Sequence, residues 1–190
     1  MPPAVVRVAE IVDPEQSRHV REARAGSTDA YELVVRGVIG WAYRVASAIV
    51  GSEHAAADAT QNALVAAWRE LPQLREPEGF EPWFRRILVN ECRMQLRRDG
   101  QSRETPVADD QEALGRLVTS GSAVRAHAID LLEQAFDRLE PDDRVLVVLH
   151  DLEDQPLGEI ADLLHVPLGT ANWRLREARF ALVQALESLE

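Results

Sequence analysis

Four polar side chains in the middle of the chain have the types and the spacing needed to contact a nucleic acid. They are separated by four, three and four residues: Arg86, Asn90, Arg93 and Arg97. In a helix, this spacing places all four on one face. Guanidinium groups suit backbone phosphates, and the amide suits the edge of an unpaired base. The pattern indicates a surface for nucleic acid, with an ordinary solvated face as the alternative.

A second basic set lies on the last predicted helix and consists of Arg174, Arg176 and Arg179. The residues Leu168-Gly169-Thr170 open that helix with a small residue and a hydroxyl, which suits close approach to phosphate. A short helix at 157–164, a turn at 165–168 and a helix at 169–180 have the order of a helix-turn-helix. A helical hairpin in an ordinary bundle gives a similar pattern, so this motif alone leaves both interpretations open.

The sequence offers little support for other chemistry. Cys92 is the single cysteine, and the five histidines show no metal-binding spacing. Glycine-rich phosphate loops and nucleophile elbows are absent. We therefore expect no disulfide framework, no metal or cofactor and no catalytic residues, so the protein is not predicted to be an enzyme. Cys92 is interpreted as a buried core thiol.

Composition sets further bounds. The 190 residues are 46% hydrophobic, which is enough for a core, and the 21 basic residues are all arginine. A net charge of −11 argues against binding to DNA through bulk charge. Most of the excess acid lies in residues 125–190. The chain shows no signal peptide and no run of 18 apolar residues, so we expect a cytoplasmic protein without membrane insertion.

Apolar residues recur every three or four positions along most of the chain, which predicts an all-α fold. Gly51 should end the first long helix and Ser52 should cap the next. Pro72 should stop that second helix, and Pro141 should open a helix in the C-terminal part. No stretch alternates with the period of a strand.

Polar residues with scattered Gly, Ser, Thr and Pro fill the region after the third helix and predict a flexible linker. We therefore expect two small helical domains. The predicted parts are a disordered N-terminal extension at 1–26, a first domain at 27–98, the linker at 99–124 and a second domain at 125–190.

Two sets of residues resemble a known family. The first is Asp58…Gln61-Asn62-Ala63-Leu64…Ala67-Trp68-Arg69…Leu71 with Phe80…Trp83-Phe84…Ile87…Asn90…Arg97-Arg98. The second is Leu139–Arg144, Glu159-Ile160-Ala161, Val166–Thr170, Arg174-Leu175 and Arg176–Arg179. They resemble regions 2 and 4 of a sigma-70-type RNA polymerase sigma factor. Having only these two regions, joined by a short linker, is typical of extracytoplasmic-function (ECF, group IV) sigma factors.

The resemblance implies three sets of site residues. Core polymerase, through the clamp helices of its β′ subunit, would contact Asp58, Gln61 and Asn62. The −10 region of the promoter would contact Leu74, Arg86, Asn90, Arg93 and Arg97. The −35 region would contact the helix-turn-helix through Thr170, Asn172, Trp173, Arg174, Arg176 and Arg179. The implied partners are core RNA polymerase (β′ clamp helices and β flap), promoter DNA and an anti-sigma factor.

Two aromatic residues of the last helix, Trp173 and Phe180, should project away from the core. Contact with thymine methyls and packing against a protein partner both remain open as their role. Glu177 lies near the presumed DNA face, where it would either repel phosphate or accept a hydrogen bond from a cytosine amine.

The resemblance implies a protein that binds core RNA polymerase and directs promoter-specific initiation. The alternative is a sigma-like decoy that binds an anti-sigma factor without starting transcription. The acidic second domain and the exposed aromatics favour the decoy, whereas the Arg86–Arg97 face disfavours it. A plain helix-turn-helix repressor would leave the first domain unexplained. For a sigma factor, the net charge predicts negligible promoter affinity for the free chain and measurable affinity once polymerase is bound.

Overall fold

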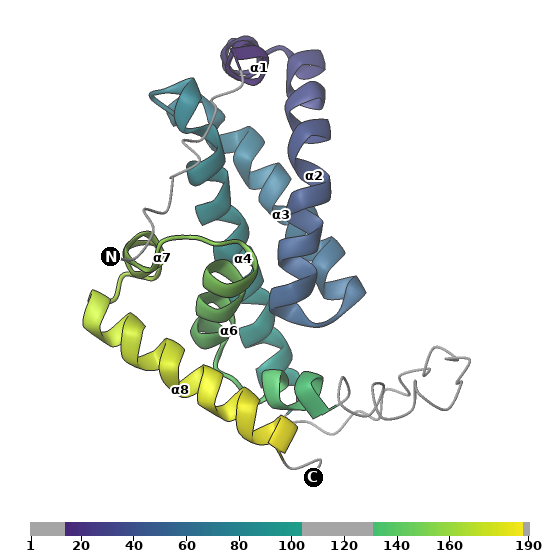
Figure 1. Cartoon of the computed structure of the whole chain (residues 1–190). Helices are drawn as coiled ribbons and strands as arrows, with labels where there is room; N and C mark the ends of the chain where they lie inside the picture. Colours follow the sequence, from purple (N-terminus) through teal and green to yellow (C-terminus); the bar gives the residue numbers. More distant parts are fainter. Residues whose placement is uncertain (1–13, 104–130, 188–190) are drawn as a thin grey trace, which may run out of the picture.

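The computed structural model describes residues 14–103 and 131–187, and all of its regular elements are helical (Figure 1). The first unit contains α1 (Pro14–Arg24), α2 (Thr28–Val50), α3 (Glu53–Glu70) and α4 (Phe80–Arg103), with short 3-10 turns at Leu71–Gln73 and Pro77–Gly79. The second contains a helical stretch at 131–137, α6 (Pro141–Val147), a π-helical turn (Val148–Leu152), α7 (Leu157–Leu164) and α8 (Leu168–Glu187). The predicted all-α fold with two helical units is confirmed.

Local chemistry fixes the ends of the central helices. The Oγ of Ser27 accepts a hydrogen bond from the backbone N–H of Ala30 at 3.2 Å and so caps α2. Gly51 ends α2 in the left-handed conformation, with φ of 73°, and its N–H donates to the carbonyl of Ser47. Ser52 then caps α3. The predicted roles of Gly51 and Ser52 are confirmed.

The core of the first unit lies between α2, α3 and α4. Alanines form the buried stripe of α3: Ala56, Ala59, Ala63 and Ala67. Because these side chains are small, the neighbouring helices approach α3 closely, and the larger core residues come from α2 and α4. The rings of Phe80 and Phe84 stack at 5.7 Å on α4. Tyr31 ties α2 to α3 through a 2.5 Å bond from its Oη to the carbonyl of Leu64.

Among the residues that the structure describes, one helix, α2, is long and apolar enough to cross a membrane by length and composition. Its buried residues lie on one stripe that includes Val34, Val38, Val45 and Ile49. This stripe packs in the helical core, as expected for the central helix of a bundle.

The N-terminal prediction needs correction. Residues 14–24, expected to belong to a disordered extension, form α1, which buries Val20 and Ala23 against the other helices of the first unit. The side chain of Arg24 also donates to the carbonyl of Arg75 at 3.1 Å. The apolar positions of α1 are too few to predict a helix from the sequence. The helix is stabilised by its packing against α2. Residues 1–13 lie outside the described part of the chain.

The linker prediction needs a similar adjustment at its start. Residues 99–103, expected in the linker, continue α4. Residues 104–124, which make up the rest of the predicted linker, lie outside the described residues, as do the first residues of the predicted second domain.

Arg144 is a buried charged residue of the second unit and is only 5% exposed. Its guanidinium donates to the carbonyls of Leu139 and Asp137, at 3.2 and 2.6 Å, and pairs with the Asp137 carboxylate at 3.1 Å. It also lies over the ring of Phe136, at 5.6 Å. These contacts hold the segment before Pro141 against α6.

The two units pack against each other, with α4 beside α6 and α2 beside the π-helical turn (Figure 1). Their buried apolar residues form one continuous cluster. A hydrogen bond of 2.6 Å also joins them, from Nε1 of Trp41 on α2 to Oε2 of Glu153 in the second unit.

Candidate nucleic-acid and polymerase interfaces

The three residues expected to contact polymerase lie on the outward face of α3. Gln61 and Asn62 are exposed, and the side chain of Asp58 is 48% exposed beside His54. The opposite face of α3 is the buried alanine stripe, so these polar groups can meet a partner without disturbing the core. The structure therefore brings Asp58, Gln61 and Asn62 together as one surface.

The predicted polar face of α4 is partly open and partly covered. Arg86, Asn90 and Arg97 are exposed, which leaves their amide and guanidinium groups available to a nucleic acid. Arg93, in the middle of the row, has a side chain that is only 16% exposed. Its Nε donates to Oδ1 of Asp142, at the start of α6, at 2.6 Å. The second unit therefore covers the centre of the predicted −10 surface.

Leu74 does not belong to that surface in this structure. It is 7% exposed and packs in the core, where it follows the 3-10 turn at Leu71–Gln73 and its N–H donates to the carbonyl of Leu71. Burial of its apolar side chain explains this position, and a buried side chain cannot contact a base. Trp83 is half-buried, and its ring lies 5.8 Å from that of Phe80, so it packs against the core as expected.

The helix-turn-helix is formed by α7, a tight turn and α8. His165 ends α7 in the left-handed conformation, with φ of 59°, and Val166 and Pro167 lead into α8. Ile160 and Leu164 of α7 and Ala171 and Leu175 of α8 are buried, so the pair packs as a hydrophobic unit. The predicted helix at 157–164 is confirmed.

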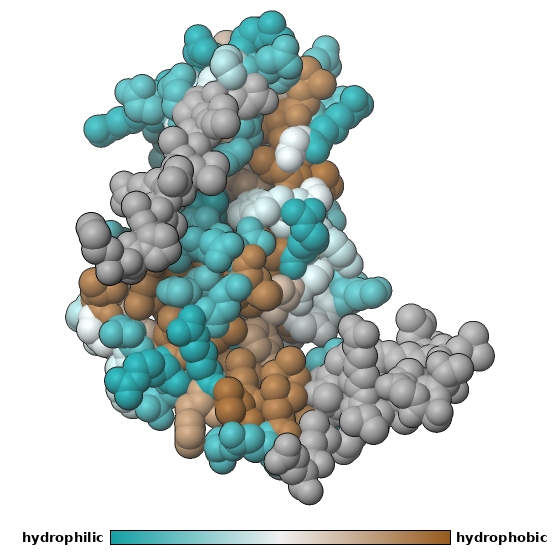
Figure 2. All heavy atoms as spheres, in the orientation of Figure 1, coloured by the Kyte–Doolittle hydropathy of each residue, from teal (hydrophilic) through white to brown (hydrophobic). Residues whose placement is uncertain are grey.

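The outer face of α8 presents a mixed surface. The exposed residues predicted to contact DNA on this helix are Thr170, Asn172, Trp173, Arg176 and Arg179. Trp173 and Phe180 are 60% and 61% exposed and lie seven residues apart, so they share a face. Figure 2 shows a further apolar area over the C-terminal half of α8 and the 131–137 segment, where Val183, Leu186 and Leu132 are exposed.

Two arginines of α8 are engaged by acids of the same unit. Arg174 donates through Nε to Oδ1 of Asp143 at 2.5 Å, and its Nη1 lies 3.5 Å from Oδ2 of Asp142. Arg179 donates to both carboxylate oxygens of Asp151. The Arg179 hydrogen bond lowers the pKa of Asp151, while the same bond raises the pKa of Arg179.

The carboxylates that hold these arginines were not among the predicted site residues. In the sequence, Asp142 and Asp143 look like ordinary acids of a first helical turn, where they favour the helix dipole. Only the packing of α6 between α4 and α8 brings them to the arginines. A long-range contact of this kind leaves no signal in residue spacing.

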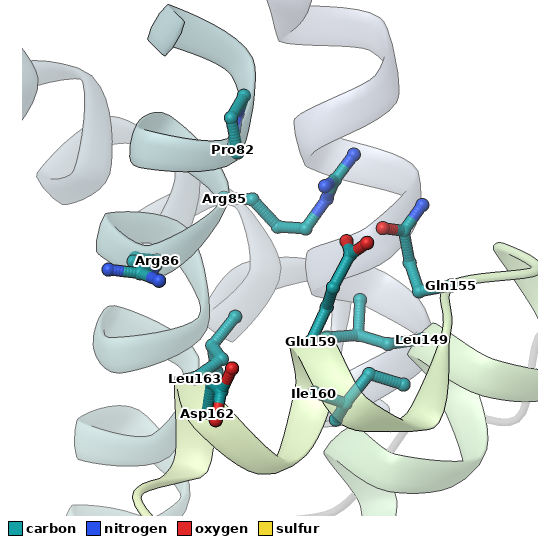
Figure 3. Close-up of a pocket in the computed structure, with 9 residues that line it drawn as sticks. All are labelled: Pro82, Arg85, Arg86, Leu149, Gln155, Glu159, Ile160, Asp162 and Leu163. Atoms are coloured by element: carbon teal, nitrogen blue, oxygen red, sulfur yellow. The ribbon is translucent and has the colours of Figure 1, made fainter. Parts of the chain in front are cut away.

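A pocket of about 240 Å³ separates the two units on one side, as Figure 3 shows. Arg85 and Arg86 of α4 line one wall, and Glu159 and Asp162 of α7 line the other. The guanidinium of Arg85 also lies 5.5 Å from the centre of the Trp41 ring. The facing walls therefore carry opposite charges.

The described ranges offer little support for metal binding or for a reactive thiol. Within residues 14–103 and 131–187, no cluster of three His, Cys, Asp or Glu side chains could hold a metal ion. Cys92 is fully buried, as predicted, and burial raises the pKa of its thiol to about 12. The thiol is therefore protonated and sheltered at neutral pH.

Comparison with protein families gives two matches. Residues 31–102 match the model of sigma-70 region 2, and residues 129–189 match that of sigma-70 region 4. Together they span more than two thirds of the chain, in the order that the sequence predicted. The match to region 2 begins and ends about four residues later than the predicted domain at 27–98.

Several curated relatives are described as ECF RNA polymerase sigma factors. The ECF RNA polymerase sigma factor SigE of Mycolicibacterium smegmatis is 31% identical over 153 residues, which are 79% of this chain and 59% of the relative. SigW of Bacillus subtilis, also an ECF sigma factor, is 23% identical over 181 residues, which are 90% of this chain and 97% of the relative. The chain thus spans less than two thirds of SigE but nearly all of SigW.

Solved structures share the fold. CnrH, in complex with the cytosolic domain of CnrY, aligns with a TM-score of 0.62 at 20% identity, covering 92% of this chain and 98% of CnrH. The sigma factor RpoE of Bartonella quintana, in complex with the anti-sigma factor NepR, aligns at 0.60 and also 20% identity, covering 83% and 96%. The two family matches, in order, and the ECF relatives agree with the helical units described above. The chain therefore belongs to the sigma-70 family of RNA polymerase sigma factors, in its ECF group.

Proposed function

We propose that this protein binds core RNA polymerase and directs it to specific promoters, where it takes part in opening the −10 region. The observation that carries the proposal is the pairing of two surfaces in one chain. One is the exposed α3 face of Asp58, Gln61 and Asn62, and the other is the polar α4 face on the neighbouring helix. A DNA-binding repressor needs neither a polymerase surface nor a second basic face beside it.

Each surface has a distinct task in this proposal. Asp58, Gln61 and Asn62 bind the β′ clamp helices of polymerase. Arg86 and Arg97 hold phosphates of the −10 region, and the amide of Asn90 bonds an unpaired base. Because unstacking costs a few kcal/mol per base, roughly, this face stabilises DNA that the polymerase helps to open.

The helix-turn-helix reads the −35 element in the proposal. Arg176 reaches phosphate or a guanine edge, while Asn172 lies beside it on the exposed face of α8. Thr170 is in the first turn of α8, where a hydroxyl and free backbone N–H groups suit phosphate. Trp173 adds apolar contact, for which the methyl group of thymine is a suitable partner.

The experiment is run-off transcription with purified core polymerase on genomic DNA fragments. The proposal predicts discrete transcripts that start only when this protein is added. Gln61→Ala with Asn62→Ala should reduce binding to core polymerase, while Glu133→Gln, an exposed change in the second unit, should not. Absence of specific starts, despite tight core binding, would contradict the proposal.

A sigma-like decoy remains the second candidate, and the exposed Trp173 and Phe180 favour it, since a protein partner would cover them. RpoE of Bartonella quintana is solved with an anti-sigma factor, which supports an anti-sigma partner for this chain in either case. A decoy would bind core polymerase or the anti-sigma factor and give no transcript on any template.

A further inference from the structure

The acids at the start of α6 contact arginines from both predicted DNA-binding surfaces. Oδ1 of Asp142 accepts from Arg93 of α4 at 2.6 Å, and its Oδ2 lies 3.5 Å from Arg174 of α8. Asp143 accepts from the same Arg174 at 2.5 Å. One short segment therefore engages the −10 row and the −35 helix at once.

These ion pairs are shielded from water. The side chains of Arg93, Asp142, Asp143 and Arg174 are between 16% and 21% exposed. Charges in such positions are screened by salt much less than charges on an open surface. The four residues therefore form a more persistent contact than the exposed pair of Arg36 and Glu32 on α2, whose side chains are 69% and 63% exposed.

Other contacts between the units support the same closed arrangement. The indole of Trp41 donates to Glu153 at 2.6 Å. The arginines and carboxylates on opposite walls of the pocket in Figure 3 attract each other across it. The ion pairs of Asp142 and Asp143 thus belong to an interface that also has apolar and complementary charged parts.

This closed arrangement cannot read a promoter. Two guanidiniums that share one carboxylate lie within roughly 10 Å of each other. The −10 and −35 elements are about 25 base pairs apart, which is roughly 85 Å along B-DNA. The two units must therefore separate before Arg93 and Arg174 can each reach DNA.

We propose that Asp142 and Asp143 form an intramolecular latch, in which their carboxylates take the place of DNA phosphates on Arg93 and Arg174 and hold the free chain closed. Binding to core polymerase separates the units and releases both arginines for the promoter. The release step rests on the proposed function, whereas the closed state of the free chain does not.

The test measures the distance between the units in the free, full-length chain. Fluorescent labels are attached at His54→Cys, where the native side chain is 90% exposed, and at Gln184→Cys, which is exposed on α8. The buried thiol of Cys92 does not compete for label. Single-molecule energy transfer then gives the ratio of open to closed molecules.

The latch variant is Asp142→Asn with Asp143→Asn. Its matched control is Glu133→Gln with Glu177→Gln, which removes two charges from the same unit at exposed residues that do not line the pocket and make no ion pair within the described ranges. The latch variant should raise the open-to-closed ratio by about tenfold, as expected for losing three shielded ion pairs, while the control stays at the wild-type ratio. A ratio equal to that of the control would overturn the latch.

A second variant replaces the two arginines of the latch instead of its two aspartates. Arg93→Gln with Arg174→Gln should open the chain to the same extent, and it decides the question if the aspartate variant does not fold, as judged by its helical circular dichroism. If this variant folds and stays closed, the latch is wrong.

Run-off transcription separates this proposal from the function itself. Wild-type protein that directs specific starts, together with a latch variant that stays closed, would refute the latch and leave the function standing. An opened latch variant, together with wild-type protein that gives no specific start, would refute the function and leave the latch standing.

Discussion

Arg93 of α4 and Asp142 of α6 form a 2.6 Å ion pair that joins two helical units across 49 residues of sequence. Because both side chains are less than 20% exposed, the pair lies inside the interface between the units. An arginine predicted to hold promoter DNA is thus bound by a carboxylate of its own chain. Because an acidic residue of the chain itself occupies this arginine, the free protein is expected to bind promoter DNA only together with polymerase.

Replacement of Asn90 by alanine should separate promoter opening from polymerase binding. The amide is exposed on α4 beside Arg86, and one good amide contact to a base is worth about 1–3 kcal/mol. Initiation should therefore fall by roughly 5- to 150-fold in run-off assays, while the affinity for core polymerase is unchanged. Gln134→Ala, which removes an exposed amide from the second unit, serves as the control. Full activity of Asn90→Ala would refute the placement of the −10 surface.

Replacement of Arg176 by alanine should reveal a phosphate contact of the helix-turn-helix. Arg176 is exposed and makes no ion pair within the described residues, so its guanidinium is available without opening the latch. Loss of one phosphate contact should reduce the slope of log K against log salt by about 0.9 for the polymerase-bound protein. Arg138→Ala removes the same charge outside α8 and should leave the slope unchanged. Equal slopes for wild type and Arg176→Ala would contradict this contact.

The pair of Asp151 and Arg179 should make stability depend on pH. The Arg179 hydrogen bond holds the folded pKa of Asp151 below its ordinary value of 3.8. The stabilisation is therefore fully present above that value and is lost as the pH falls through the lower folded pKa. At pH 7, Asp151→Asn should lower the free energy of unfolding by up to ~1 kcal/mol, and less below pH ~4.

Urea denaturation of wild type and Asp151→Asn at several pH values measures this dependence. Glu133→Gln provides the control for loss of an exposed carboxylate. A difference between wild type and Asp151→Asn that grows toward acid pH would have the wrong sign for this mechanism.

Two glycines of the first unit should respond in opposite directions to alanine. Gly51 has φ of 73°, and an added Cβ would lie 3.4 Å from Oδ1 of Asp137, so Gly51→Ala should destabilise the fold by about 1–2 kcal/mol. Gly37 lies inside α2 with open space around its Cα, so Gly37→Ala should stabilise by about 0.5–1 kcal/mol. Urea denaturation measures both, and shifts of the same sign would contradict the helix assignment.

Local signals in the sequence predicted much of the fold. Gly51 and Ser52 mark the turn between α2 and α3 because each acts on its own neighbouring backbone groups. Pro141 opens α6 for the same reason. The spacing of apolar residues along the sequence predicts α7. Helix α1 was missed because it buries only a few small side chains, and its stability depends on α2.

The candidate site was predicted in part. The shared face of Asp58, Gln61 and Asn62 follows from helical spacing alone. The burial of Leu74 and the pairing of Arg93 with Asp142 do not, because they depend on residues distant in the sequence. Helical periodicity places a residue on a face, but only tertiary packing decides whether another element covers that face.

The measurement that tests the central claim most directly is the binding of a labelled promoter duplex, which is monitored by fluorescence anisotropy. The duplex is taken from a start site found by run-off transcription, and it is titrated with the free protein, with core polymerase and with both together. We predict negligible specific binding by the free protein or by core polymerase alone, and tight specific binding by the complex. Equally tight binding by the free protein, or no gain in specificity on adding it to polymerase, would contradict the account.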